Sequence, residues 1–229
     1  MSKIAILIDG GYFLKRLSTV RPNIDPWKPD DVADAIARLV TSHLTAHNKI
    51  AGQKHPRSNL YRVFYYDASP YLAKGHKPIS KSAIDYSKTK EARFRLGLFE
   101  RLRRSPNTAV RLGEVRRERG WIMKEEPQKE LLSGRKAVGD LTDDDFAPGL
   151  RQKAVDMKIG LDIASLTLKK QVRHIVLVAG DADFVPAAKL ARREGVRIVL
   201  DPLWRSVAAD LFEHIDMLYS GFPKPKANE

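Results

Sequence analysis

Three aspartates follow apolar stretches of the sequence, at points where buried strands are expected to end. Asp9 comes directly after the apolar run 4–8, and Asp181 and Asp183 come just after the run 174–179. The carboxyl ends of the strands in a parallel α/β sheet meet at one edge, where ligands bind. Carboxylates at this edge with no basic residue beside them are typical of a divalent-metal site. We therefore expect the three acids to lie close together.

Two further acids stand in the segment 153–162, which has a helical pattern. Asp162 follows Asp156 by six residues, which is about 600° around a helix and so about 120° away from the face of Asp156. Both side chains cannot easily point at one ion if the helix is regular. We predict that Asp156 takes part directly and keep Asp162 as a second-tier metal ligand.

Gathering carboxylates costs electrostatic energy. Two of them about 4 Å apart repel by roughly 1 kcal/mol in water and by about 4 kcal/mol at an effective dielectric of 20. The cluster must therefore raise its pKa values or bind a cation. Mg²⁺ or Mn²⁺ is the expected cofactor, because these hard ions prefer oxygen ligands. Zinc is disfavoured because cysteine is absent and the histidines lack ligand spacing.

Each acid also has a plainer explanation when it is taken alone. Asp183 could cap a helix, Asp9 could be a turn residue before glycines, and Asp156 could be a solvated residue on a polar helix face. The coincidence of all four acids favours the metal site.

The charge of the chain favours a polyanionic partner, with nucleic acid first among the candidates. The net charge is +13 with a sequence pI near 9.9, and residues 88–119 hold eleven basic side chains against four acidic ones. An acidic site within a basic surface is what a metal-dependent nuclease would need. The residues predicted to bind nucleic acid are Arg93, Arg101, Arg103, Arg104, Arg116, Arg117 and Lys158.

Apolar runs that alternate with helical patterns must position these residues. This alternation predicts a mostly parallel sheet with right-handed crossovers. The expected strands are 3–8, 60–66, 174–179, 196–200 and a short edge strand at 217–219. The expected helices are 12–17, 31–47, 89–104, 148–170, 184–194 and 206–214.

The middle of the chain has a weaker pattern. Residues 108–116 and 121–124 predict a hairpin or two edge strands, and 69–87 look irregular. Residues 125–147 are polar and predict a mobile loop, and the tail 223–229 is expected to be disordered.

The sequence also indicates where the protein works. There is no cysteine, no stretch typical of a signal peptide and no apolar run of membrane-spanning length. We therefore expect a cytoplasmic protein without a membrane partner. The sequence leaves open whether the chain forms a homo-oligomer.

Three blocks of sequence carry a family resemblance. They are Ile-Asp-Gly-Gly-Tyr-Phe at 8–13, the segment 153–162, and Gly-Asp-Ala-Asp-Phe-Val-Pro at 180–186. In this order they resemble the NYN family, a branch of the PIN-like metal-dependent ribonucleases that includes the LabA/DUF88 proteins. The resemblance covers about 1–20 and 150–220. It departs from the family pattern at Tyr12, where many members have Asn, at Ala154 in place of Gly, and at Ala182 in place of Ser.

The resemblance implies a three-layer α/β/α PIN-like, Rossmann-like fold around a central, mostly parallel sheet. It implies one domain over 1–222 with a basic elaboration at about 69–147. It further implies a hydrolase that cleaves RNA phosphodiester bonds as an endoribonuclease, with RNA or another nucleic acid as partner. The residues matched to the Mg²⁺ or Mn²⁺ ligands are Asp9, Asp156, Asp181 and Asp183.

Two other classes of function remain open. One is a non-catalytic RNA-binding or regulatory module, suggested by Tyr12 at the usual Asn position. The other is a phosphohydrolase of small substrates or a toprim-type enzyme, because Asp-x-Asp follows a strand there too. A toprim domain has Glu where this chain has Asp9, and a haloacid-type phosphatase has Asp where this chain has Gly11.

Overall fold

A seven-stranded sheet with the order β6-β5-β2-β1-β7-β8-β9 forms the centre of the computed structural model, which describes residues 3–51 and 59–225. Every neighbouring pair is parallel except β5 and β6, which are antiparallel. The strands are β1 (Ile4–Asp9), β2 (Leu60–Ala68), β5 (Thr108–Met123), β6 (Phe146–Lys153), β7 (His174–Val178), β8 (Arg197–Asp201) and β9 (Met217–Leu218).

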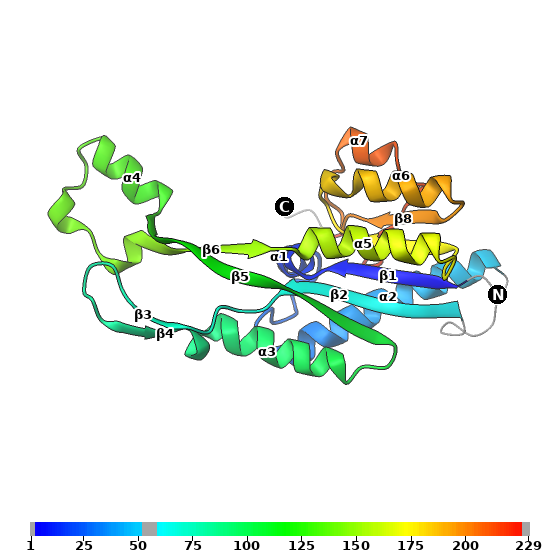
Figure 1. The fold of residues 1–229 in the computed structure, drawn as a ribbon, viewed down its shortest axis with the longest axis horizontal. Helices are drawn as coiled ribbons and strands as arrows, with labels where there is room; N and C mark the ends of the chain where they lie inside the picture. Colours follow the sequence, from blue (N-terminus) through cyan, green and yellow to red (C-terminus); the bar gives the residue numbers. More distant parts are fainter. Residues whose placement is uncertain (1–2, 52–58, 226–229) are drawn as a thin grey trace.

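Helices cover both faces of this sheet, as Figure 1 shows. The helices α1 (Gly10–Val20), α2 (Pro29–Ala51) and α3 (Lys90–Arg103) share one core cluster with Ile4, Ile6 and Ile8. The helices α5 (Val155–Leu168) and α6 (Val185–Arg193) share the other with Ala5 and Leu7. Side chains of a strand alternate between its two faces, so β1 is buried on both. The predicted three-layer α/β/α arrangement is confirmed.

An arm extends from the sheet beyond the carboxyl end of β1 (Figure 1). The first part of β5 pairs with β2 and the second part pairs with β6. The short helix α4 (Glu125–Leu132) and the hairpin of β3 (Lys74–His76) and β4 (Ala83–Asp85) complete the arm. The hairpin is tied to the rest of the arm where the Trp121 indole N–H donates to the His76 carbonyl at 3.0 Å and the Ser80 hydroxyl donates to Asp143 at 2.6 Å.

The structure corrects the predictions for the middle of the chain. Residues 108–123 are one continuous strand rather than a hairpin or two strands. The predicted mobile loop 125–147 holds α4 and the 3₁₀ turns Val138–Asp140 and Asp143–Asp145. The supposedly irregular segment 69–87 includes β3 and β4.

The helix predicted from Pro148 begins only at Val155. Pro148 lies in β6, where it pairs with Trp121 across the arm. Ala154 then turns the chain with a φ of 67°, in the left-handed region, before α5 starts. The helix α5 continues through Gly160 without a break.

The remaining elements match their predictions apart from their ends. The helix α7 (Ala209–Phe212) is shorter than expected, and a 3₁₀ turn, η5 (Ala182–Phe184), precedes α6. Gly195 follows the end of α6 with a φ of 77°, in the left-handed region that is typical of the residue after a helix. The helix α2 continues to Ala51 instead of ending near residue 47. Residues 226–229 of the predicted disordered tail lie outside the described residues. Among the described residues, no helix is long and apolar enough to cross a membrane.

Candidate active site

The first two predicted acids lie at the same edge of the sheet. Asp9 is the last residue of β1, and Asp181 follows β7, which pairs with β1 in parallel register up to Ile8 and Val178. Asp9 caps α1 by accepting a hydrogen bond from the Tyr12 backbone N–H at 3.1 Å. Asp181 caps η5 by accepting one from the Asp183 backbone N–H at 3.1 Å. Asp9 and Asp181 are therefore the helix caps, whereas the sequence suggested this role for Asp183, which lies inside η5. Each cap keeps carboxylate capacity for a further partner.

Asp156 reaches this edge by a different route. The strand β6 returns along β5 from the arm, and the turn at Ala154 places Asp156 in the first turn of α5. Burial raises the pKa of Asp156, and the charges of Asp181 and Asp183 raise it further. The three acids therefore lie within electrostatic reach of one another.

Asp9 has the clearest electrostatic perturbation of the four. Burial is the main cause that raises its pKa from 3.8 to about 6, and the charges of Asp156 and Asp67 add to it. The Tyr12 N–H opposes this effect because it stabilises the carboxylate. Among the described residues, no ion pair joins a cation to Asp9, Asp156, Asp181 or Asp183.

The donor set fits a hard divalent cation in its chemistry. All four side chains are carboxylates, they repel one another, and nearby cations do not neutralise them. The arrangement is open rather than preassembled: within 3–51 and 59–225, no three acid or histidine side chains already form a group that could hold a metal ion. Oxygen donors at this edge could still bind Mg²⁺ or Mn²⁺ while water completes the coordination shell.

Asp162, the second-tier candidate, is engaged elsewhere. Its carboxylate accepts a hydrogen bond from the Tyr66 hydroxyl at 2.8 Å and lies 3.3 Å from the Arg111 Nε. These partners come from β2 and β5, on the flank of α5 that packs against the sheet. The structure does not bring Asp162 to the other four acids, in keeping with its angular offset from Asp156 on a regular helix.

An acid that the sequence argument left without a role lies beside the site. Asp67, near the end of β2, is completely buried and forms an ion pair with Arg95 of α3. It also accepts hydrogen bonds from the Ala68 N–H at 2.8 Å and the Tyr65 hydroxyl at 3.4 Å. Burial raises the pKa of Asp67, while Arg95 lowers it. In the sequence, Asp67 follows an apolar run as Asp9 does, and this position could have indicated that it lies at the same edge of the sheet.

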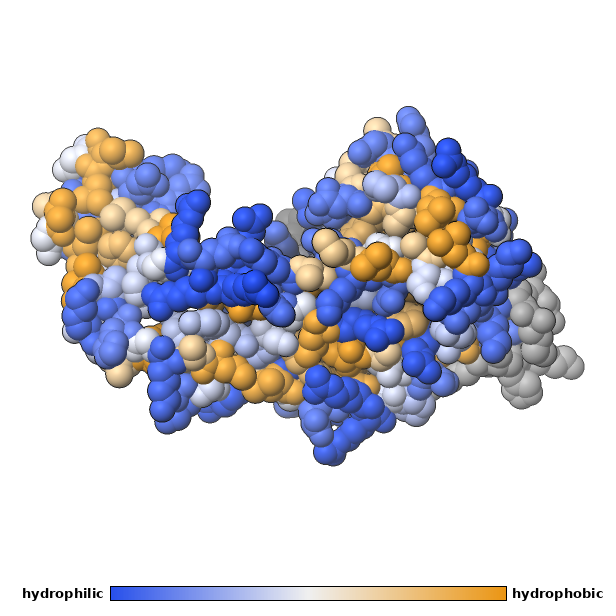
Figure 2. Space-filling model, in the orientation of Figure 1, coloured by the Kyte–Doolittle hydropathy of each residue, from blue (hydrophilic) through white to orange (hydrophobic). Residues whose placement is uncertain are grey.

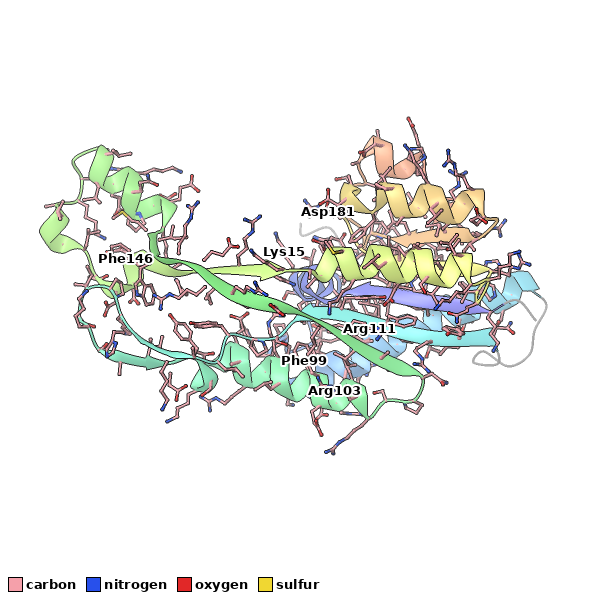
Figure 3. The ribbon with its side chains drawn as sticks, in the orientation of Figure 1. Lys15, Phe99, Arg103, Arg111, Phe146 and Asp181 are labelled. Carbon is pink, nitrogen blue, oxygen red and sulfur yellow. The ribbon has the colours of Figure 1, made fainter. Side chains whose placement is uncertain are left out.

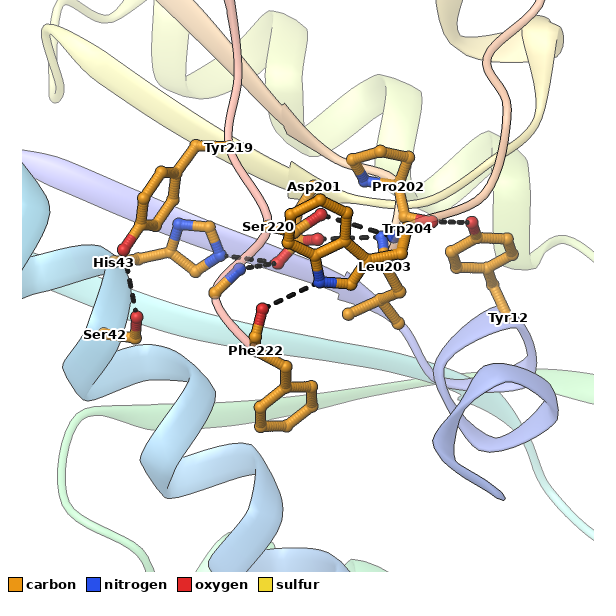
Figure 4. A network of polar contacts seen from close by, with 11 residues as sticks. Tyr12, Ser42, His43, Asp201, Pro202, Leu203, Trp204, Tyr219, Ser220 and Phe222 are labelled. Atoms are coloured by element: carbon orange, nitrogen blue, oxygen red, sulfur yellow. Dashed lines mark hydrogen bonds and ion pairs between the residues drawn. The ribbon is translucent and has the colours of Figure 1, made fainter. Parts of the chain in front are cut away.

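Tyr12, the residue at which the sequence departs from the pattern it resembles, makes a structural contact. Its hydroxyl donates to the Pro202 carbonyl at 2.6 Å (Figure 4). Its ring fills the space next to Gly180, where any Cβ would clash with it. Burial raises the pKa of Tyr12 to about 12, so the hydroxyl stays protonated as a donor. Tyr12 thus braces the turns that carry Asp9 and Asp181.

The loop that receives Tyr12 is held by a buried pair. His43 of α2 lies 2.8 Å from the Asp201 carboxylate at the end of β8. Asp201 also accepts hydrogen bonds from the backbone N–H groups of Leu203 at 2.8 Å and Gly221 at 2.9 Å, as Figure 4 shows. This network fixes the chain after β8 against α2.

Several cations predicted to bind nucleic acid lie far from the acids. Arg101 and Arg103 lie in the last turn of α3 and Arg104 follows it as the C-cap. The strand β5 begins shortly after them, at the edge of the sheet opposite the acids. Figure 3 places Arg103 away from Asp181 accordingly. Arg101 lies 3.1 Å from Asp30 in an ion pair, and Arg104 is paired with Glu100 at 2.7 Å.

The other predicted cations are nearer the arm but have partners. Arg93 donates to the Lys88 carbonyl, and Lys158 donates to the Leu112 carbonyl at 2.9 Å. Arg116 is paired with Glu114 at 2.7 Å, and the Arg117 guanidinium lies 5.9 Å from the centre of the Trp121 ring. The hydrogen bond to Leu112 gives Lys158 a structural role. Arg116 is exposed, so it can still contact a phosphate.

Basic residues that the prediction omitted are better placed. Lys15 of α1 is exposed and lies on the side of Asp181 in Figure 3. Arg151 and Lys153 of β6 are exposed and share Glu118. Figure 2 shows a concave surface between the arm and the body of the molecule, with a hydrophilic floor over β5 and β6. The strand β6 leads from this surface into Asp156.

Comparisons with known proteins agree with part of this picture. Residues 107–213 match the family model of the NYN domain, which belongs to the PIN-like nuclease superfamily, so the predicted resemblance is confirmed. The matched range includes Asp156, Asp181 and Asp183, while Asp9 lies before it. No curated protein gives a significant match. A crystal structure of a protein of unknown function from Vibrio parahaemolyticus RIMD 2210633 aligns at 17% identity and a TM-score of 0.45, over 96% of this chain and 95% of that chain.

Proposed function

The chain carries an NYN domain of the PIN-like nuclease superfamily over residues 107–213, and from this premise we propose that it is a Mg²⁺- or Mn²⁺-dependent endoribonuclease. The observation that carries the proposal is the set of four aspartates at one edge of the sheet. They influence one another electrostatically and have no cationic partner among the described residues. Clustered acids of this kind destabilise a pure binding module, whereas a metal-dependent hydrolase needs them.

Asp9, Asp156, Asp181 and Asp183 would hold the metal. When bound, a divalent cation lowers the pKa of a coordinated water and stabilises the leaving oxygen of a phosphodiester. The chain's own contribution is to present ionised carboxylates, and Asp9 is ionised only above its pKa of about 6. Tyr12 supports this geometry because it holds the turns of Asp9 and Asp181 together.

The concave surface beside the arm would bind the RNA backbone. Its exposed cations on β5 and β6, which include Arg116, Arg151 and Lys153, can contact phosphates without reading base sequence. Their partial pairing with Glu114 and Glu118 lowers the local charge. Binding through phosphates should weaken steeply as salt rises.

Cleavage of a labelled RNA tests the proposal. Wild-type protein with Mn²⁺ or Mg²⁺ should cleave the RNA internally, and Asp9→Asn and Asp181→Asn should lose at least two orders of magnitude in rate. Asparagine can still cap α1 and η5, so the fold should persist. Asp144→Asn, an exposed change on the arm, is the matched control and should cleave like wild type. No cleavage by wild type with either metal, or equal rates in all variants, would refute the proposal.

A non-catalytic RNA-binding module is the second candidate, and two observations favour it. Tyr12 occupies the usual Asn position, and the described acids form no preassembled metal group. Calorimetric titration with Mn²⁺ separates the two candidates. Binding that Asp181→Asn abolishes supports the nuclease, and no heat of binding with native protein supports the module.

A further inference from the structure

The outer face of α5 is apolar although it is exposed. Met157, Leu161 and Leu168 are 68%, 62% and 58% exposed. Among the side chains that the structure describes, no other helix or strand carries more than one large apolar residue that is exposed. Figure 2 shows hydrophobic atoms at the surface over this helix. Such a concentration marks an interaction site, whereas single exposed apolar residues are ordinary.

The outer residues of α5 do not serve the core of the chain. The opposite face of the helix packs against the sheet through buried residues, namely Val155, Ile159, Ile163 and Leu166. A helix at the surface of a folded chain has one apolar stripe and one polar face, and a helix that is apolar on both sides is covered on both. The outer stripe therefore calls for a partner outside the chain.

The spacing of the outer stripe is that of a seam between two helices. The stripe consists of Met157, Leu161, Ala164 and Leu168, which are four, three and four residues apart. This is the a/d spacing with which one helix packs along another. The spacing is also symmetric, so a twofold axis at its midpoint sets Met157 of one copy opposite Leu168 of the other. It likewise sets Leu161 opposite the small Ala164. A second copy of α5 that runs antiparallel is thus complementary to the first.

The charges at the two ends of this face are complementary in the same direction. Both α5 and α6 start at the acidic edge of the sheet, next to the aspartates. Their other ends are basic, with the exposed side chains Lys169, Lys170 and Arg193. Antiparallel pairing sets the acidic end of each copy against the basic end of the other, whereas parallel pairing would set like charges together. The net charge of +13 opposes self-association at longer range, and salt screens that repulsion.

We propose that the protein forms a homodimer in which α5 packs antiparallel against α5 of a second copy. This inference goes beyond the proposed function and does not depend on RNA cleavage. Each acidic edge gains positive charge from the second copy, beside the place proposed for an RNA phosphate. A pair of helices about 21 Å long buries less than the roughly 1,600 Å² of a standard interface, so the dimer should dissociate on dilution.

Sedimentation velocity in EDTA and about 0.3 M NaCl tests whether the dimer forms. Wild type should shift from monomer to dimer as the protein concentration rises from about 1 µM to about 200 µM. Leu161→Glu should weaken association by about a hundredfold or more, because it brings an unpaired carboxylate into the seam from each copy. Leu161 is exposed in the single chain, so the melting temperature of this variant at about 1 µM should stay near that of wild type. Leu132→Glu, the same change at an 82% exposed position of α4, is the matched control and should dimerise like wild type.

Complementary variants test the register of the seam. Ala164→Lys alone should also weaken dimerisation, because it sets an ammonium group against Leu161 of the second copy. A mixture of the Leu161→Glu and Ala164→Lys proteins should associate at least about tenfold more tightly than either protein does with itself. In the mixed dimer, the carboxylate introduced into one chain faces the ammonium group introduced into the other.

Introduced cysteines test the antiparallel direction, because the chain has none of its own. Met157 and Leu168 are eleven residues apart, which is about 16 Å along the helix. A mixture of the Met157→Cys and Leu168→Cys proteins should form covalent dimers with a short bismaleimide cross-linker. Each protein alone should not, because its two thiols lie at opposite ends of the seam.

The outcomes decide on the dimer and leave the proposed activity to its own test. Monomer at every concentration would overturn the inference, and so would a dimer that Leu161→Glu leaves intact, because the contact would then lie elsewhere. Cross-linking of each cysteine variant with itself would indicate parallel helices and would also overturn it. A dimer that behaves as expected but cleaves no RNA would support the α5 seam and refute only the nuclease.

Discussion

Replacing Asp9 with asparagine should stabilise the metal-free protein at neutral pH. The structure raises the pKa of Asp9 from 3.8 to about 6, chiefly by burial. At about 1.4 kcal/mol per factor of ten in the proton-dissociation constant, this corresponds to an upper limit of about 3 kcal/mol. Asparagine resembles the protonated acid and can still accept the Tyr12 N–H, so it should recover about 1–3 kcal/mol of that cost.

The sign follows from proton linkage. An acid with a raised pKa holds its proton more tightly when folded, so wild type loses stability as pH rises from 3.8 to about 6. The gain of Asp9→Asn should therefore be near zero at pH 4 and full at pH 7.5. In a chain of this size it should raise the melting temperature by about 2–12 °C, at roughly 2–4 °C per kcal/mol. Thermal unfolding followed by circular dichroism across this pH range in EDTA measures it.

Two controls make the result interpretable. Asp144→Asn should shift the melting temperature little at any pH, because Asp144 is exposed on the arm. Excess Mg²⁺ should raise the melting temperature of wild type more than that of Asp9→Asn, since a ligand that binds only the folded state stabilises it. A lower melting temperature for Asp9→Asn at pH 7.5, or a gain that is the same at pH 4, would contradict the electrostatic reasoning.

Three more predictions follow from the same edge of the sheet. The affinity for Mn²⁺ should fall by about tenfold per pH unit below about 6, because protonated Asp9 must lose its proton to bind the ion, which calorimetric titration across this pH range would detect. Gly180→Ala should lower stability by about 1–3 kcal/mol and reduce cleavage, because its methyl group would push the Tyr12 ring away, and chemical denaturation would measure the loss. Arg95→Ala should lower stability by about 3–5 kcal/mol because it leaves Asp67 buried and unpaired, and adding Asp67→Asn should recover most of that loss in the same assay.

The sequence predicted the parallel core because its signals there are local. The continuous apolar run before Asp9 and the run before Asp181 are typical of strands buried on both faces. Because parallel strands end at one edge of a sheet, these acids could be assigned to that edge without a structure. That their strands, β1 and β7, are neighbours is known only from the structure. The family match also confirms the resemblance on which part of the site assignment rested.

The arm could not be predicted because its elements are stabilised by distant partners. Pro148 suits the first turn of a helix, yet pairing with Trp121 keeps it in a strand. The wrong placement of Arg101 and Arg104 near the acids has a related cause. Counting charges along the sequence cannot tell which edge of the sheet a helix end reaches. Asp67 was left without a role because nothing in the sequence connects it to Arg95, which lies 28 residues later.

The continuity of β5 restricts how the arm can move. One strand belongs both to the sheet, through β2, and to the arm, through β6, so a hinge at the arm root would break ladder hydrogen bonds on both sides. The pairing of β5 with β6 is irregular between Arg117 and Trp121. There Gly149 packs closely on Arg119: a Cβ added to Gly149 would lie 2.8 Å from the Arg119 side chain. Amide hydrogen exchange should therefore be slow on the body side of this irregularity and faster beyond it. The width of the concave surface is then set mainly when the protein folds, and only the outer part of the arm adjusts to a bound strand.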